Sequence, residues 1–410
     1  MTLTVLLLFL ACALSPSQAD TEIRAIAIIS RHSDRTTEYT FPNDPHPINK
    51  IVNGTEIPNT EDWPEGEARL TEKGKNRIHD LGTMIRNRYN ELFPVKLEDI
   101  GADVRARASS SNRTQETARR LATRISDVAP IQVEVDDKMM MDPPPDCPAI
   151  GAVKKTIYAS AEAQAFSEDH KDQFAELSKN AGEEVKTIDR AYEIHDTIRV
   201  EKENGKSVPD WASGDLMKFL QQTDSIYSCI NSASNTTTRL QMGLLLTDLK
   251  DQFEQIAAGN SSEKLLVYTT HDTKVSMLQR LLNCYEIGHP ATYLAGVIFE
   301  LHQDPATNES FVRSYYVHLE EIKDTGLYNP VEVVAAPTSC DKEELCDLEK
   351  YFEGLAPAML EDLTDPCNQT DVSNDNKGDF AACFSGSASL TASLLTLMAT
   401  AVALMNYSSA

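Results

Sequence analysis

Two arginines flank a histidine directly after an apolar run near the start of the chain, at Arg31, His32 and Arg35. The run, residues 23–29, is rich in isoleucine and alanine, which is typical of a parallel strand buried on both faces. Open α/β sheets place their ligands just beyond the carboxyl ends of such strands. A solvated loop would explain this cluster equally well if it stood alone. The residue types are nevertheless those of a site for a phosphoryl group.

Two further segments end in the same way. Residues 264–270 form an apolar run that stops at His271 and Asp272, although Asp272 could simply cap the helix pattern that follows. Residues 103–108 precede a serine-rich turn and a helix pattern with Arg113 in its first turn, where free backbone N–H groups favour an anion. Three strand ends thus supply arginines, histidines and a carboxyl group, a set that unrelated loops would not explain.

This set suits the hydrolysis of a phosphomonoester through a covalent phosphohistidine. Guanidinium groups match the charge that a phosphoryl group spreads over its oxygens during transfer. A neutral imidazole attacks without the help of a base, so His32 is the expected nucleophile. Asp272 would protonate the leaving group and later act as the base on water. The expected phosphate-binding residues are Arg31, Arg35, Arg113 and His271.

Several segments resemble, in the same order, the histidine acid phosphatases of the prostatic and lysosomal type. The family pattern R-H-G-x-R has its counterpart in residues 31–35, and the late H-D pair in residues 271–272. The similar segments are residues 41–45, 63–74, 81–89, 112–114, 239–243 and 271–279. The resemblance implies acid phosphatase activity with the residue roles given above. It also implies an α/β fold, a three-layer sandwich with a mainly parallel central sheet and an inserted helical cap domain.

Two features depart from the family pattern. Ser33 stands where the family usually has glycine, and a serine there is strained if the position requires a positive φ. Residues 46–62 form an insertion-like stretch that contains a glycosylation sequon at Asn53, which indicates an exposed loop. All the charged catalytic positions are present, which favours an active enzyme.

The pattern between the motifs predicts the domain organisation. Residues 146–245 are polar and rich in alanine, with helical periodicity and no strong strand signal, so we expect a helical cap over the site. The phosphatase core is then formed by residues 20–145 and 246–370.

Both ends have the pattern of processing signals. Residues 1–19 are expected to be a signal peptide. Residues 371–410 contain a polar spacer and an apolar tail with no basic residue after it, which favours a glycosylphosphatidylinositol (GPI) attachment signal. A transmembrane anchor remains the alternative. The candidate attachment residues are Asn376, Gly378 and Ser385.

The cysteines predict disulfides. Removing both ends deletes Cys12 and, as we expect, Cys383, and leaves an even number of cysteines in an oxidising compartment. Their spacing is not that of a zinc site, so neither a metal nor a cofactor is expected. The resemblance implies the first two of the following pairs, and the third is what remains. The expected disulfides are Cys147–Cys367, Cys340–Cys346 and Cys229–Cys284.

Sequons predict glycans on a secreted protein. Asn112 is adjacent to Arg113, and a glycan there would crowd the site, so we expect Asn112 to stay unmodified. The expected glycosylation sites are Asn53, Asn235, Asn260, Asn308 and Asn368.

The composition of the 410-residue chain limits its partners. The formal net charge of −25 speaks against nucleic acid as a partner. We expect phosphomonoester substrates, passage through the secretory pathway, and attachment to the outer leaflet through a lipid. Without the tail, the enzyme would be secreted or lysosomal. A homodimer is left open, as are two other classes: a binding protein without turnover, and a mutase, phytase or lysophospholipid phosphatase on the same scaffold.

Overall fold

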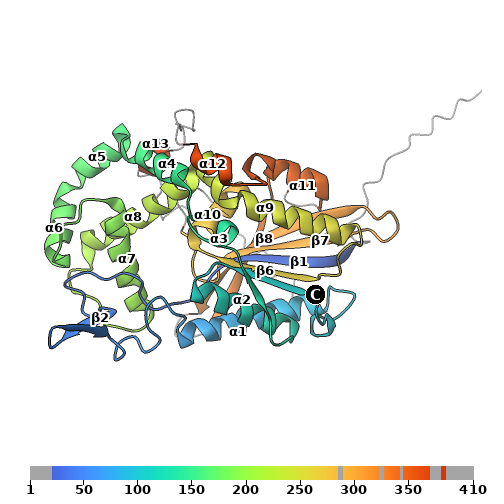
Figure 1. The fold of residues 1–410 in the computed structure, drawn as a ribbon, viewed down its shortest axis with the longest axis horizontal. Coiled ribbons are helices and arrows are strands. Elements are labelled where there is room, and N and C mark those ends of the chain that lie inside the picture. The colour runs from blue at the N-terminus through green and yellow to red at the C-terminus, as the bar shows by residue number, and fades with distance from the viewer. Residues whose placement is uncertain (1–20, 285–289, 323–326, 342–344, 370–379, 385–410) are drawn as a thin grey trace, which may run out of the picture.

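The computed structural model describes residues 21–284, 290–322, 327–341, 345–369 and 380–384. Within these residues the centre of the molecule is an eight-stranded mixed sheet, with β9 paired to β8 outside the order β10-β8-β7-β1-β6-β4-β5 (Figure 1). The strands are β1 (Glu22–Arg31), β4 (Val104–Ala108), β5 (Val133–Val135), β6 (Leu265–Thr270), β7 (Gly296–Gln303), β8 (Ser310–Ile322), β9 (Leu327–Ala335) and β10 (Cys346–Asp347).

The half of the sheet that carries the site is parallel. β1 runs parallel to β6, and β6 runs parallel to β4, which in turn pairs in parallel with β5. On the other side of β1, strands β7, β8, β9 and β10 are antiparallel. The carboxyl ends of β1, β6 and β4 therefore meet at one edge, as expected for a ligand site in an open sheet.

Helices cover both faces of this sheet (Figure 1). Ile26 and Ile28 of β1 belong to the core shared with α1 (Glu72–Asn90) and α2 (Asn112–Ser126). Ala25, Ala27 and Ile29 belong to the opposite core, shared with α9 (Asn235–Ala257), α10 (Asp272–Leu281) and α11 (Leu348–Leu355). Successive residues of β1 are thus buried on alternate faces. The expected three-layer α/β sandwich is confirmed, with a mixed sheet.

A group of helices lies to one side of the sandwich (Figure 1). Its members share a separate hydrophobic core, which includes Phe166, Leu177, Ile198 and Leu220. They are α4 (Pro148–Tyr158), α5 (Ala161–Asp169), α6 (Lys171–Ala181), α7 (Ile188–Glu203) and α8 (Gly214–Ala233). The predicted boundary at residues 245 and 246 falls inside α9, whose side chains pack on the sheet. We keep the name cap for α4–α8.

The insertion-like stretch, residues 46–62, contains a hairpin of β2 (Asn49–Val52) and β3 (Thr55–Pro58). Asn53 and Gly54 form its turn with positive φ angles of 53° and 78°, as a tight hairpin turn requires. The hairpin side chains are mostly exposed, and so are the sequon asparagines among the described residues, which is compatible with glycosylation. Short helices complete the chain: α3 (Asp137–Met140), α12 (Thr364–Asn368) and α13 (Phe380–Phe384).

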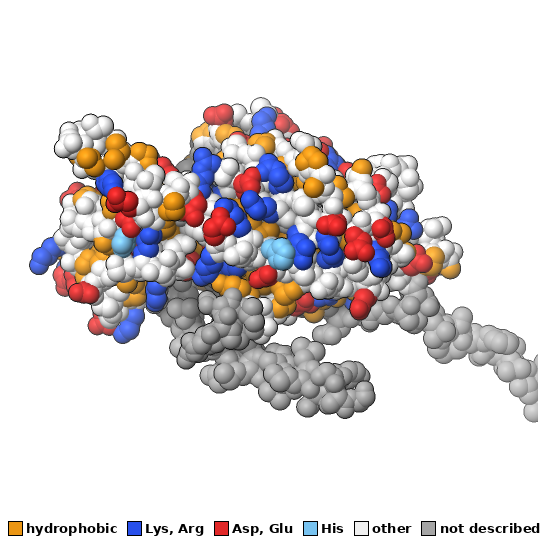
Figure 2. Space-filling model, turned by 90° about the horizontal axis from the view of Figure 1, so that it is seen from below, with side chains coloured by type: hydrophobic (Ala, Val, Ile, Leu, Met, Phe, Trp, Pro, Cys, Tyr) orange, Lys and Arg blue, Asp and Glu red, His pale blue; other side chains and the backbone are white. Residues whose placement is uncertain are grey.

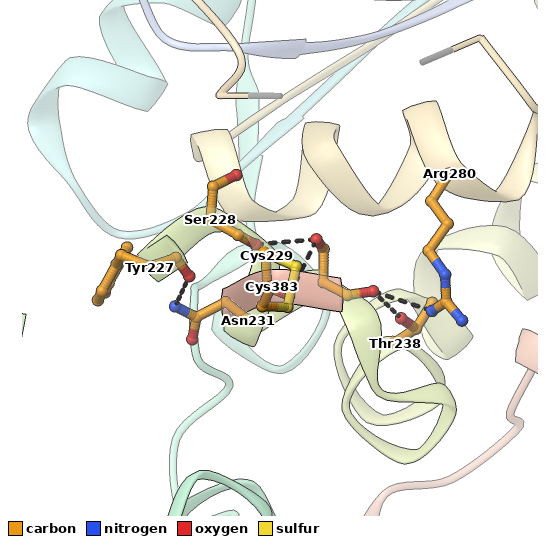
Figure 3. The surroundings of a disulfide bond; sticks show 8 residues. Tyr227, Ser228, Cys229, Asn231, Thr238, Arg280 and Cys383 are labelled. Carbon is orange, nitrogen blue, oxygen red and sulfur yellow. Dashed lines mark hydrogen bonds between the residues drawn. A yellow bond between two sulfur atoms is a disulfide. The ribbon is translucent and has the colours of Figure 1, made fainter. Parts of the chain in front are cut away.

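The disulfides differ from expectation in one pair. Cys147–Cys367 and Cys340–Cys346 are present, as the resemblance implies. The pairing of Cys229 with Cys284 is wrong, because Cys229 of α8 is bonded to Cys383 of α13 with their Cα atoms 5.6 Å apart (Figure 3). The prediction failed at the step that assigned Cys383 to a discarded tail. Cys284 lies outside the three bridges.

Charge is mixed on the face seen in Figure 2, where Lys and Arg side chains are interspersed with Asp and Glu. Among the described residues, we find no helix with the length and apolar character needed to cross a membrane. The apolar tail, residues 388–405, lies outside the described residues.

Candidate active site

The strand register brings the three motif segments together. Arg31 at the end of β1 pairs with Thr270 at the end of β6, and Ala108 of β4 pairs with Thr269 of β6. His32 and His271, the next residues after β1 and β6, therefore lie side by side with ring centroids 5.7 Å apart. The adjacent start of α2 supplies Arg113.

The backbone fixes the tautomer of His32. Its Nδ1 lies 2.8 Å from the carbonyl oxygen of Ser33, which can only accept a hydrogen bond, so Nδ1 must carry the proton. The lone pair of Nε2 is then available, and the Nε of Arg113 donates to it at 3.1 Å. A phosphoryl group that replaced this contact would meet the nucleophilic nitrogen directly.

Ser33 fits its position without backbone strain. It is not among the described residues with positive φ, so the strain considered above does not arise. Its backbone N–H donates to Thr117 Oγ1 at 3.2 Å, and its hydroxyl donates to the carbonyl of Gly74 at 2.9 Å. Gly74 is required there, because a Cβ on it would lie 2.4 Å from the carbonyl oxygen of Asp34. These contacts hold the loop after β1 against α1 and α2.

Each of the three expected phosphate-binding arginines is paired with a carboxylate. Arg31 contacts Asp272 at 2.7 Å, Arg35 contacts Asp196 at 2.8 Å, and Arg113 contacts Glu38 at 3.1 Å. We call Arg31, Arg35 and Arg113 the arginine clamp. These carboxylates therefore neutralise the charges of the clamp from within the protein.

Burial keeps both histidine rings neutral. Burial, reinforced by the positive charges of Arg113 and Arg31, holds the pKa of His32 well below its usual value. Burial and Arg113 likewise lower the pKa of His271 to about 3. His271 Nε2 lies 3.1 Å from Ser109 Oγ. The neutral His271 ring has a single N–H to offer a phosphoryl oxygen, while His32 stays nucleophilic in acid.

Asp272 is ionised beside Arg31. Burial would raise the pKa of this carboxyl group, but the positive charges of Arg31 and Arg199 outweigh it and hold the pKa below its usual range. The side chain is 28% exposed, and its Oδ1 also accepts from the backbone N–H of Thr273 at the start of α10. Asp272 therefore faces the site while it also contacts the first turn of α10.

Two acidic residues of the site were not found from the sequence. Asp196 on α7 is fully buried and contacts both Arg35 and Arg199, so it links the cap to the loop after β1. Glu38 lies in that loop, three residues after Arg35. The spacing from Arg35 to Glu38 was a usable signal for an ion pair, whereas Asp196 resembles any other acidic residue in a helical stretch.

A pocket of about 410 Å³ opens beside Arg31 and Asp272. Tyrosines of the cap and of the sheet domain line it, among them Tyr192 and Tyr227, whose rings stack 3.8 Å apart. Four cationic and four acidic side chains also line it, so its charges cancel: Arg31, Lys73, Arg77, Arg199, Asp34, Glu203, Asp224 and Asp272. In the part of the chain that the structure covers, no cluster of three or more His, Cys, Asp or Glu side chains could hold a metal ion.

The α/β fold with a histidine among arginines at the strand ends can be compared with known protein families. Residues 22–123 match the family model of the histidine phosphatase superfamily, branch 2. Rat prostatic acid phosphatase is 27% identical over 386 residues, which cover 89% of this chain and 93% of the relative. Human lysosomal acid phosphatase is 25% identical over 384 residues, covering 88% and 84%.

Solved structures show the same fold. A Hafnia alvei phytase in complex with myo-inositol hexakis sulphate superposes with a TM-score of 0.61 over 85% of this chain and 99% of its own, at 13% identity. A Klebsiella phytase gives a TM-score of 0.56 over 84% and 97%, at 18% identity. Residues 22–123 are thus similar to branch 2 of the histidine phosphatase superfamily, and the resemblance of the chain to the prostatic and lysosomal acid phosphatases is confirmed.

Proposed function

We propose that this protein is an acid phosphatase that hydrolyses phosphomonoesters through a covalent phosphohistidine on His32, with Asp272 as the proton donor. The observation that carries the proposal is the environment of His32 Nε2. The ring is neutral, its Nδ1 proton is fixed by the Ser33 carbonyl, and Arg113 lies at Nε2. The nucleophilic nitrogen thus faces a guanidinium group that would bind the transferred phosphoryl group.

Substrate binding would prepare Asp272 for its role. A phosphoryl group that binds Arg31 replaces the Arg31–Asp272 ion pair and places an anion beside the carboxylate. Both changes raise the pKa of Asp272, because the charged form loses its partner and gains a like charge. In acid the carboxyl group is then protonated and can give its proton to the leaving oxygen as the bond between phosphorus and that oxygen breaks.

The second step would return the enzyme to its starting state. The Asp272 carboxylate takes a proton from water, whose oxygen attacks phosphorus as the bond to His32 Nε2 breaks. Inorganic phosphate leaves, and Nε2 regains its lone pair. Arg31, Arg35, Arg113 and His271 would bind the phosphoryl oxygens through both steps.

The pocket beside Asp272 favours a monophosphate over a polyphosphate. The leaving group must lie on the Asp272 side, where the lining charges cancel and stacked tyrosines offer an aromatic surface. A polyanion such as an inositol polyphosphate needs an excess of positive charge. Among the alternatives left open above, the pocket therefore disfavours a phytase.

A substrate panel with a chelator tests the proposal. We expect hydrolysis of aryl monophosphates with an acidic optimum, slow hydrolysis of inositol hexakisphosphate, and no effect of EDTA. Binding of phosphate without hydrolysis would favour the non-catalytic class. A loss of activity in EDTA that a divalent cation restores would contradict the mechanism.

We propose further that the mature enzyme is held on the outer leaflet by a GPI anchor attached after Cys383. Attachment at Asn376 or Gly378 would separate Cys383 from the chain and remove the bridge to Cys229. Ser385 is the candidate that keeps this bridge, and it lies outside the described residues. A homodimer remains part of the proposal, and light scattering of the released enzyme would detect it.

A further inference from the structure

Glu38 occupies two members of the arginine clamp. Its Oε2 lies 3.1 Å from Nη2 of Arg113 and 3.5 Å from Nη2 of Arg35, and its Oε1 accepts from Arg113 at 3.2 Å. The same Arg113 donates through Nε to His32 Nε2 at 3.1 Å. A phosphoryl group would need the guanidinium groups beside the nucleophile, and the Glu38 carboxylate is already bound to them.

The backbone on both sides of Glu38 is fixed. Thr37 accepts through its carbonyl from the N–H of Ala68 at 3.0 Å, and its hydroxyl donates to the carbonyl of Tyr39 at 2.7 Å. Thr197 of the cap donates to the same Tyr39 carbonyl at 3.2 Å. The loop thus presents Glu38 to the clamp through its own backbone contacts.

The Glu38 side chain, unlike its neighbour Asp196, can leave the clamp. Asp196 is fully buried between Arg35 and Arg199, so its carboxylate cannot turn to water, and moving it would take from the buried Arg35 its closest partner. Glu38 is 30% exposed, so its carboxylate can turn to water and be solvated there. The two acidic residues therefore have different functions, although both contact Arg35.

We propose that Glu38 is an internal competitor for the phosphate-binding arginines. Its carboxylate must leave Arg113 and Arg35 before a phosphoryl group can bind, and it returns when inorganic phosphate departs. Glu38 therefore lowers the affinity of the site for phosphate and limits inhibition by the product. The inference rests on the proposed function only for the assignment of the arginines to phosphate.

Titration calorimetry with inorganic phosphate tests this without requiring turnover. The Glu38→Gln variant keeps the size of the side chain and removes its charge, and it should bind phosphate about 5- to 20-fold more tightly than the parent at neutral pH. Glu38→Ala should change the affinity in the same direction, which excludes an effect of the new amide.

The matched control is Glu116→Gln. Glu116 lies on α2 three residues after Arg113, is 29% exposed and pairs with Arg119 and Arg120 instead of the clamp. It should bind phosphate within about twofold of the parent. An unchanged or weaker affinity in the Glu38 variants, or an equal gain in Glu116→Gln, would overturn the proposal. Weaker binding would mean that Glu38 positions Arg113. A parent enzyme that binds phosphate but hydrolyses no ester would refute the proposed function and leave the competition measurable.

Discussion

Within the same site, the surroundings keep His32 neutral and keep Asp272 charged. The ring of His32 is kept neutral by burial and by the surrounding arginines, so acid does not protonate the nucleophile until the pH falls well below its usual pKa. Arg31 holds the pKa of Asp272 below its usual range, and in the proposed mechanism this carboxyl group is protonated only after a phosphoryl group displaces it from Arg31. Acidic conditions would therefore protonate Asp272, the expected proton donor, while His32 stays neutral and nucleophilic. This is the physical reason to expect an acidic pH optimum for hydrolysis.

Substitutions should separate the two roles. His32→Ala removes the nucleophile and should lower kcat by more than about 10⁴-fold on every ester. Asp272→Asn should cost about 10²- to 10⁴-fold on an alkyl phosphate, whose leaving oxygen needs a full proton, and much less on an aryl phosphate. The measurement is kcat for one aryl and one alkyl ester with each variant. Equal losses of Asp272→Asn on both esters would make this residue a helix cap or a partner of Arg31 only.

The sequence predicted which strand ends form the candidate site. Two apolar runs and a short strand, each followed by charged residues, predicted that His32, Arg113 and His271 would meet, and the parallel register of β1, β6 and β4 brings them together. The contacts of Asp196 and Glu38 could not be predicted in this way. They depend on how the cap and the loop after β1 pack, and neither packing has a local periodic signal.

The helix α7 is joined to the site through Asp196. Burial would raise the pKa of this carboxyl group, but Arg35 and Arg199 outweigh it and hold the pKa below its usual range. A depressed pKa in the folded state gives stability that is present above the unfolded pKa of about 4 and is lost as the pH falls through the folded value. The link should therefore persist throughout the acidic working range.

Asp196→Asn should destabilise the protein by about 3 kcal/mol at both pH 5 and pH 7, because the buried Arg35 and the partly buried Arg199 each lose their closest carboxylate. Urea unfolding at the two pH values measures this. The control is Asp189→Asn on the same helix, where the carboxylate is 35% exposed and pairs with Lys154. A loss for Asp196→Asn no larger than that of the control would show that the buried ion pair does not hold the cap.

The disulfide between α8 and α13 could not be predicted from the sequence, because the composition of the tail favours a discarded attachment signal. A small apolar helix after a polar spacer has the same composition as the start of an attachment signal, so Cys383 was assigned to the discarded part. In the structure Cys383 is bonded to Cys229 (Figure 3). It is 4% exposed within the core of the cap, and Phe384 packs beside Phe166. Residues that pack into a core in this way belong to the fold.

Cys229→Ser and Cys383→Ser should each destabilise the protein by about 2–4 kcal/mol. The double variant should lose no more than either single variant, because all of them remove the same bond. Thermal unfolding of the oxidised proteins measures the losses, and a mass spectrum without reduction should show the two cysteine peptides joined. If Cys284→Ser reproduced the loss of Cys229→Ser, the originally expected pairing would be correct.

The bridge between Cys229 and Cys383 limits where the proposed GPI anchor could be attached to the folded molecule. Phosphatidylinositol-specific phospholipase C should release active phosphatase from intact cells. A chain that stops after residue 384 should be secreted with the stability of the released enzyme, whereas a chain that stops at residue 371 should be less stable because it lacks Cys383. Enzyme that stays on the membrane after lipase treatment, with residues 394–405 still in its mature C-terminus, would instead indicate a transmembrane helix.

The proposed mechanism requires that the phosphoryl group is bound covalently to Nε2 of His32 during each turnover. The most direct test is to mix the enzyme with a phosphomonoester labelled in its phosphorus, stop the reaction within one turnover, and map the label under conditions that preserve phosphohistidine. We predict a label on the peptide that contains His32, with the acid lability of a phosphoramidate, and none in His32→Ala. Turnover without any labelled protein, or a label that persists in His32→Ala, would contradict the phosphohistidine mechanism.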